Sequence, residues 1–394
     1  MNKTLFVILK TAERCNLKCK YCYFFYGGDE SYKKHPPFIS IRTIHQLSKF
    51  LAQGIEDLQL SRIEVIFHGG EPMLQSIKDF EEMCSLIQKD LFGLAEINFK
   101  IQTNATLVTD KWIEAFSKYN VFVGVSLDGP REYNDVNRID HRNKGSYDAV
   151  RRGIERLQKA VASKKISPIG ALCVINPERD AKIIYRHFVD ELAIYNLDFL
   201  LPEFTKDTFP IGNVLLYGKY LCELFEEWIS DKNINIHVRI IDSIIKVLMG
   251  LQPSLISIGK EKDDLYAVTI SSNGEISLDD TLRAIDKGRL MQVANIENMS
   301  ISDFFNLPII QSIKSCTKNL PNGCTNCCWQ KVCSGGYYMH RYSNKNGFDN
   351  PSVMCEALKM IYTKAAAFLL KSGYSIFDLE NTLGIKQIRS LVKK

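Results

Sequence analysis

The chain has 394 residues, of which 45% are hydrophobic and 24% are charged, proportions typical of a globular protein with about two domains. Its net charge of +5 is small for this length and does not indicate a nucleic-acid partner. No apolar run approaches the roughly 18–20 residues that cross a bilayer, which argues against a membrane protein. Twelve cysteines without a secretory signal indicate metal ligation in a reducing compartment, and we expect a cytoplasmic location.

Strand patterns alternate with helical patterns through the first half of the chain. The expected strands are 6–9, 62–67, 98–102, 121–126, 170–175 and 197–201. The expected helices between them are 41–53, 80–91, one that begins at Asp110, 146–161 and 180–195, with Ser40, Asp110 and Ser146 as N-caps. This alternation predicts an α/β fold with a parallel sheet and right-handed crossovers.

The pattern changes in the second half. Expected helices at 215–229 and 240–249 lead to short strands at 267–270 and 275–278, which flank a Ser-Asn-Gly hairpin signal. A cysteine-dense, loop-rich stretch follows, and then a helix at 356–371 and a basic tail. We therefore expect four segments, with the boundaries 1–212, 213–260, 261–356 and 357–394.

Cys15, Cys19 and Cys22 form a C-x3-C-x2-C motif directly after the first expected strand. Three thiolates on so short a loop can converge on one soft metal centre, and thiolate favours iron–sulfur or zinc. No fourth ligand is evident, whereas a structural zinc site or an ordinary ferredoxin site needs four. The alternative is chance clustering among twelve cysteines.

This spacing resembles the signature of the radical S-adenosylmethionine (SAM) enzymes, in which three cysteines hold a 4Fe–4S cluster whose free iron binds SAM. Tyr21 matches the aromatic residue that these enzymes carry before the last cysteine. The resemblance implies that 1–212 forms a partial (β/α)6 TIM barrel, and that a helical bridge at 213–260 joins it to a C-terminal iron–sulfur domain.

Further segments at expected strand ends match residues that contact SAM in this family. The implied set is Gly69, Gly70 and Glu71 of a GGEP segment, Asn104 of a QTN segment, Ser126 and Asp128 of an SLDGP segment, and Arg138. In the family, the GGEP segment hydrogen-bonds the SAM amino group, and an arginine pairs with the SAM carboxylate. The glycines are also expected to let the backbone approach a ligand closely. The alternatives are a plain strand-end turn for the GGEP segment and a surface ion pair for the arginine.

Four cysteines of the second half resemble the SPASM and twitch domains, which bind auxiliary iron–sulfur clusters in radical SAM peptide maturases: Cys324, Cys327, Cys333 and Cys355. A full SPASM domain holds two such clusters, but Asp279 and Tyr337 stand where ligands of the cluster nearer SAM are expected. We therefore expect one auxiliary 4Fe–4S cluster, with a four-cysteine zinc site as the alternative. Because Cys328 or Cys316 could substitute as a ligand, the ligand set stays open.

Asp280 follows directly after the position of that missing ligand. In the sulfatase-maturing relatives, an aspartate at the matching position accepts a proton near the substrate carbon. A partly desolvated carboxylate makes a plausible general base, so the resemblance implies a catalytic role for Asp280. The alternative is a turn aspartate after a hairpin.

Within the family, the single auxiliary cluster and the segment after Cys22 look most like the cyclophane-forming (triceptide) maturases of ribosomally made precursor peptides. There, a 5′-deoxyadenosyl radical takes a hydrogen from a side-chain Cβ, and the carbon radical joins an aromatic ring. The resemblance thus implies an oxidoreductase that forms a carbon–carbon crosslink, with a precursor peptide and an electron donor such as flavodoxin or ferredoxin as partners. The alternatives are sulfatase maturation, in which serine or cysteine becomes formylglycine, and a non-catalytic metal-binding protein that presents a peptide. The missing cluster argues against sulfatase maturation.

Overall fold

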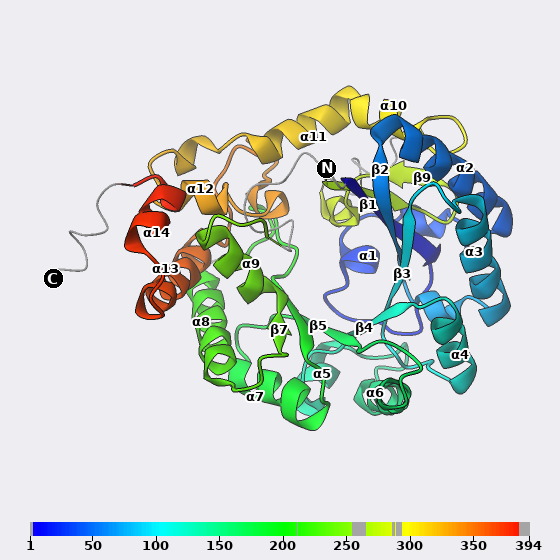
Figure 1. Ribbon diagram of the computed structural model, residues 1–394, viewed down its shortest axis with the longest axis horizontal. Coiled ribbons are helices and arrows are strands. Elements are labelled where there is room, and N and C mark those ends of the chain that lie inside the picture. Colours follow the sequence, from blue (N-terminus) through cyan, green and yellow to red (C-terminus); the bar gives the residue numbers. More distant parts are fainter. Residues whose placement is uncertain (1–2, 211, 254–264, 286–287, 289–293, 386–394) are drawn as a thin grey trace. The chain divides into compact units, whose positions relative to one another are not determined.

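The computed structural model describes residues 3–210, 212–253, 265–285, 288 and 294–385 (Figure 1). Two compact units share the chain: Met1–Leu172 with Lys262–Gln311, and Cys173–Glu261 with Ser312–Lys394. Each unit is therefore built from two separate stretches of sequence. The four predicted segment boundaries stay a prediction, because compactness alone does not locate them. The basic tail that we expected after residue 371 is described only up to residue 385, and the rest of it lies outside the described residues.

The first unit contains a mainly parallel sheet. Its strand order is β10-β9-β8-β1-β2-β3-β4-β5. The parallel strands are β1 (Lys3–Ala12), β2 (Leu60–Gly69), β3 (Glu96–Thr103), β4 (Phe122–Ser126), β5 (Gly170–Val174) and β8 (Leu265–Ile270), while β9 (Glu275–Ser277) and β10 (Ala294–Asn295) run antiparallel. This arrangement confirms the predicted α/β fold with parallel strands.

Helices cover one face of this sheet. The larger helices of the unit are α2 (Ile41–Leu58), α3 (Ile77–Asp90), α4 (Asp110–Lys118) and α6 (Tyr147–Ala162), and the shorter ones are α1 (Tyr23–Tyr26), α5 (Arg131–Asn137) and α10 (Ile301–Asn306). Figure 1 shows α2, α3 and α4 along the same side of strands β1–β3. The core forms there: Phe67 of β2 packs against Phe80 of α3 and Phe99 of β3, with ring centroids 4.8 and 5.6 Å apart. Alternate residues of each strand therefore face away from these helices.

The helix N-termini differ in part from the predictions. The Ser40 hydroxyl accepts a hydrogen bond from the backbone N–H of Thr43, as a helix N-cap does. The N-cap of α4 is Thr109, one residue before the predicted Asp110, and Ser146 precedes α6 without a capping hydrogen bond. The predicted helix 180–195 is also shorter: α7 (Ala181–Arg186) passes into a π-helical turn, η3 (His187–Glu191).

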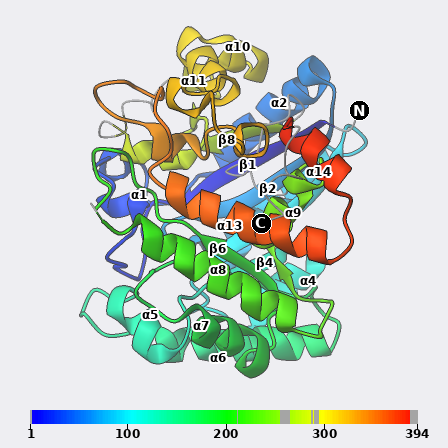
Figure 2. The ribbon, with the colours of Figure 1, turned by 90° about the vertical axis from the view of Figure 1, so that its left-hand side faces the viewer.

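The second unit is mostly helical. Its strands β6 (Asn196–Leu200) and β7 (His237–Val238) form a parallel pair. Its helices are α7, described above, α8 (Val214–Ser230), α9 (Arg239–Leu248), α12 (Gln330–Cys333), α13 (Cys355–Lys371) and α14 (Ile376–Leu383), and α11 (Pro308–Lys318) ends in it. Helices α8 and α13 lie side by side (Figure 2) because Gly218 leaves room: a Cβ there would lie 2.4 Å from the Met360 sulfur. Sequence patterns did not predict α14. Among the described helices, none is long and apolar enough to cross a membrane.

Candidate active site

The cysteine motif lies on a loop that follows β1 and leads into α1. Backbone N–H groups of Lys18 and Lys20 donate to the carbonyls of Ile139 and Asn137, at 2.6 and 3.0 Å, and tie the loop to the end of α5. The three thiols are half-buried. Burial raises the pKa of Cys15 to about 12, and it also raises the pKa values of the two other thiols. Bound metal would have to displace these protons, as metals do when they bind thiols.

The GGEP segment packs directly against this loop. Backbone N–H groups of Gly70 and Glu71 donate to the carbonyls of Ala12 and Arg14, at 2.7 and 2.8 Å. A Cβ on Gly69, whose φ is +127°, would lie 2.2 Å from the Ala12 carbonyl oxygen, and a Cβ on Gly70 would lie 2.2 Å from that of Arg14. The two glycines are therefore required for close packing of the cysteine loop on β2, which is a different reason from the ligand approach that we expected.

The carboxylate of Glu71 is fully engaged by the protein. It accepts hydrogen bonds from the backbone N–H groups of Met73 and Asn104, at 3.0 and 2.7 Å, and from the Thr103 hydroxyl at 2.7 Å. Burial raises the pKa of Glu71, although these donors oppose that effect. The Asn104 side chain in turn donates to Asn16 of the cysteine loop at 2.9 Å. Both residues thus join strand ends to the loop, and a direct contact with SAM stays a prediction.

Tyr21, Asp128 and Arg138 meet beside the cysteines. The Tyr21 hydroxyl donates to Asp128 at 2.6 Å, and Arg138 donates to the Tyr21 oxygen at 2.9 Å. Arg138 is buried, and its Nε has no hydrogen-bond partner within the described part of the chain. A buried guanidinium with spare donors fits a carboxylate ligand such as that of SAM, because an unpaired buried donor is costly. Ser126 is the last residue of β4, two residues before Asp128. Its hydroxyl accepts a hydrogen bond from the Gln102 side chain at 2.8 Å.

Asp280 belongs to a charged cluster that sequence reasoning missed in part. It is buried at the start of a 3₁₀ turn, η4 (Asp280–Ala284), where its Oδ2 pairs with the ammonium of Lys10 and accepts from the Tyr23 hydroxyl at 2.5 Å. The Lys10 ammonium also lies 3.0 Å from Nδ1 of His68. The one available signal was Lys10 itself, since a lysine within an apolar strand needs a buried partner.

The charges of this cluster depend on one another. Burial alone would raise the pKa of Asp280, but the Lys10 ammonium holds that pKa well below its ordinary value of 3.8. Burial and the same ammonium lower the pKa of His68 to about 3, so its imidazole is neutral at physiological pH. Burial likewise lowers the pKa of Lys10, against the attraction of the carboxylate. The result is an ionised aspartate and a neutral histidine on either side of one cation.

A second buried ion pair holds α1 against η4. Arg283 pairs with Asp29, and its guanidinium lies over the ring of Phe24 at 4.4 Å from the ring centroid. Asp29 also accepts from the backbone N–H and the hydroxyl of Ser31, at 2.9 and 2.7 Å. This packing places Tyr23, which follows the last cysteine of the motif, against Asp280.

Four cysteines of the second unit line one small cavity of about 60 Å³: Cys324, Cys327, Cys333 and Cys355. Burial, followed by the charges of its neighbours, raises the pKa of Cys333 to about 12. Cys328 is exposed, and neither it nor the half-buried Cys316 lines the cavity. Among the described residues, no three or more histidine, cysteine or acidic side chains are placed so that they could hold a metal ion. Ligation by either cysteine group therefore stays a prediction.

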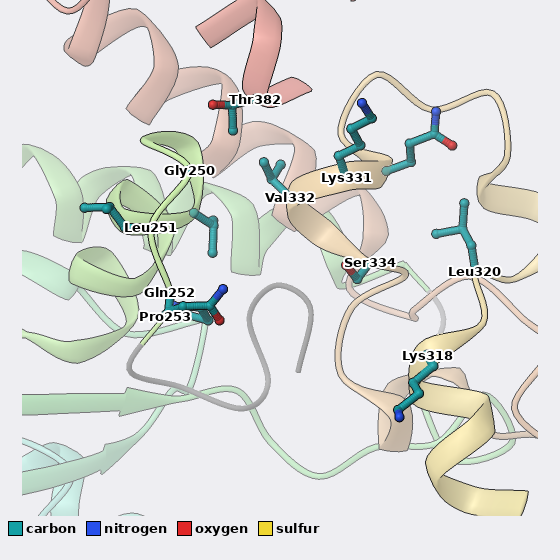
Figure 3. A pocket seen from close by; sticks show the side chains of 12 residues that line it. Gly250, Leu251, Gln252, Pro253, Lys318, Leu320, Lys331, Val332, Ser334 and Thr382 are labelled. Carbon is teal, nitrogen blue, oxygen red and sulfur yellow. The ribbon is translucent and has the colours of Figure 1, made fainter. Parts of the chain in front are cut away.

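A separate cavity of about 610 Å³ lies in the same unit, near the ends of α9 and α11 (Figure 3). Its lining includes Leu251, Lys318, Leu320 and Lys331. None of the predicted ligand or SAM-binding residues lines it, so it is not part of the predicted site.

Residues 9–178 match the family model of the Radical SAM superfamily. This match confirms the predicted radical SAM fold, and it confirms the predicted cofactor class, SAM with 4Fe–4S clusters. The matched stretch contains the cysteine motif, the GGEP segment and the arginine discussed above.

Relatives align with almost the whole chain. A cysteine-type anaerobic sulfatase-maturating enzyme of Clostridium novyi is 24% identical, with 92% of this chain and 95% of the relative covered. A serine-type anaerobic sulfatase-maturating enzyme of Bacteroides thetaiotaomicron is 25% identical, with 93% and 91% covered. A solved structure, native anSMEcpe with bound AdoMet and Cp18Cys peptide, superposes with a TM-score of 0.79 at 23% identity and covers 94% of this chain and 98% of that one.

These relatives overturn the predicted crosslinking reaction. The prediction of a cyclophane-forming maturase of ribosomal precursor peptides was wrong, because nearly full-length relatives of both types are sulfatase-maturating enzymes. Asp279 and Tyr337, which stand where ligands of the nearer cluster were expected, bear on the number of clusters and do not exclude sulfatase maturation.

Proposed function

We propose that the chain is a radical SAM enzyme that oxidises the Cβ of a serine or cysteine in a peptide to the aldehyde of formylglycine. The observation that carries this proposal is the ionised Asp280 beside the cysteine loop, in a chain whose relatives over almost its whole length are sulfatase-maturating enzymes.

The residues after β1, β2 and β4 would hold the cofactors. Cys15, Cys19 and Cys22 would ligate the 4Fe–4S cluster, and Arg138 would bind the SAM carboxylate through donors that the described protein leaves unused. When bound, this pair of cofactors supplies a 5′-deoxyadenosyl radical that removes one hydrogen atom from the substrate Cβ.

Asp280 would take the second hydrogen as a proton. Oxidation of CH₂–OH to an aldehyde, or of CH₂–SH to a thioaldehyde, removes two hydrogens in all. The second hydrogen leaves the oxygen or sulfur as a proton, and its electron would go to an iron–sulfur acceptor. The acceptor we propose is a single auxiliary cluster on Cys324, Cys327, Cys333 and Cys355; the thioaldehyde formed from cysteine is then hydrolysed by water. Because Lys10 lowers the pKa of Asp280, the carboxylate is ionised and can receive this proton.

The test is an anaerobic assay of the iron-reconstituted protein with SAM, a reductant and a sulfatase peptide that carries the target residue. We expect 5′-deoxyadenosine and a peptide aldehyde, trapped by a hydrazine reagent and identified by mass spectrometry. Replacement of all three cysteines of the motif by alanine should abolish both products. Cleaved SAM with a modified peptide that contains no aldehyde would contradict the proposed function.

A further inference from the structure

The side chains of Lys10 and His68 project from the same face of the sheet. They are register partners on the adjacent parallel strands β1 and β2. Their neighbours Leu9 and Phe67 form the preceding register pair, and Phe67 packs against Phe80 of α3. Because side chains alternate along a strand, Lys10 and His68 face away from that helix, at the end of the strands where the cysteine loop begins.

The contact with Lys10 determines which nitrogen of His68 carries the proton. An ammonium group is a donor only, so Nδ1 of His68, 3.0 Å from it, must accept. The neutral imidazole therefore carries its proton on Nε2. His68 is half-buried, and within the described chain its Nε2 has no partner and is not among the fully buried polar atoms. This N–H is consequently a donor that is free for a ligand.

Asp280 offers the complementary acceptor. Lys10 and Tyr23 both bind its Oδ2, and no described group donates to Oδ1, which is likewise not among the fully buried, unpartnered atoms. Both side chains touch the same Lys10 ammonium, so the residue that carries the free acceptor and the residue that carries the free donor are neighbours around one group. From this arrangement we infer that Asp280 Oδ1 and His68 Nε2–H together bind the hydroxyl of the target side chain, and that the enzyme prefers serine to cysteine. This inference rests on the proposed function.

The preference follows from the hydrogen-bonding capacity of the two side chains. A hydroxyl can donate to Asp280 and at the same time accept a strong hydrogen bond from His68. A thiol is a weak donor, and its sulfur is a weak acceptor, so it would leave both groups poorly paired. Lys10 acts as a positioning residue, because it holds the carboxylate ionised and the imidazole in the required tautomer.

The experiment compares two sulfatase peptides that differ only in serine or cysteine at the oxidised position, with rates normalised to bound iron. For the unmodified enzyme we expect kcat/KM to be about tenfold higher for the serine peptide, as one well-formed hydrogen bond would give. His68→Phe should remove this preference, mainly through a higher KM for the serine peptide. His68→Gln, whose side chain retains an N–H donor, should restore it in part. His45→Phe, at an exposed position of α2, is the matched control and should keep the preference.

Three results would overturn the inference. An unmodified enzyme that favours the cysteine peptide, or treats both alike, excludes a hydroxyl-specific pair. A His68→Phe enzyme that loses activity equally on both peptides would mean that the imidazole supports the fold or binds the peptide backbone. If neither peptide is oxidised although SAM is cleaved, the proposed function itself fails, and the serine preference fails with it.

Discussion

At the scale of single residues, Asp280 is the most consequential side chain. It is buried, ionised and bound through one oxygen only, so its second oxygen is available for a proton. These features fit the proton acceptor that the sequence predicted better than they fit a turn aspartate, which needs no lysine partner.

We expect Asp280→Asn to separate radical formation from product formation. Asparagine keeps the shape of the side chain but cannot accept a proton at neutral pH, so aldehyde yield should fall by about 10²-fold or more. Hydrogen abstraction comes first, and 5′-deoxyadenosine should still form in the presence of peptide. The ratio of aldehyde to 5′-deoxyadenosine, measured by mass spectrometry, decides the matter. An unchanged ratio would remove Asp280 from the mechanism.

Lys10 is predicted to stabilise the fold mainly through Asp280. Lys10→Met leaves a carboxylate buried without its counter-charge, which typically costs about 3–5 kcal/mol of unfolding free energy. Lys10→Met combined with Asp280→Leu removes both charges and should be more stable than Lys10→Met alone. Denaturant unfolding of the unmodified protein, of Lys10→Met, of Asp280→Leu and of the double variant measures this. Strictly additive losses would show that the two side chains do not depend on each other.

At the scale of elements, the buried His35 connects the end of β1 to β9. Its Nδ1 lies 3.1 Å from Glu13 and its Nε2 lies 3.1 Å from Glu275. Burial opposes the charged form, but hydrogen bonds to both carboxylates raise the pKa of His35 from 6.5 to about 9. The protonated imidazole thus joins the residue after the first strand to the hairpin that leads to Asp280.

This link predicts a stability that depends on pH. Because the folded-state pKa of His35 lies above its unfolded value, its contribution is complete below about pH 6.5 and is lost as pH rises towards about 9. The loss should amount to at most about 3 kcal/mol of unfolding free energy. Urea unfolding at about pH 6 and at about pH 9, on either side of this range, measures the loss of stability. His35→Gln should flatten the dependence, whereas a change at the exposed His45 should not; a steep dependence that survives in His35→Gln would assign it to other groups.

At the scale of the whole molecule, the two cysteine groups belong to different compact units. The two proposed clusters would therefore share no ligand, so that either could be lost without removing a ligand of the other. The cavity between the cysteines of the second unit also distinguishes adjacent residues, since Cys327 lines it and Cys328 does not.

The iron content of the protein should depend on a cysteine that lines the cavity and not on the exposed Cys328. Cys333→Ala should lose about four irons per chain and destabilise the second unit, because cluster binding and folding are coupled. Cys328→Ala, the matched control, should keep its iron and its melting temperature. Iron analysis and thermal unfolding under anaerobic conditions provide the measurement. Equal iron loss in both variants would show that the exposed cysteine also serves as a ligand.

The sequence by itself determined the features that depend on local order along the chain. Strand patterns that alternate with helical patterns specified the parallel strands, and the spacing of Cys15, Cys19 and Cys22 predicted a three-ligand loop. Both depend on residues that are close together in sequence. The meeting of Lys10, His68 and Asp280 was decided only by the tertiary structure. Lys10 and Asp280 are 270 positions apart, and the strand register that pairs Lys10 with His68 follows from packing of whole strands and not from either residue's neighbours.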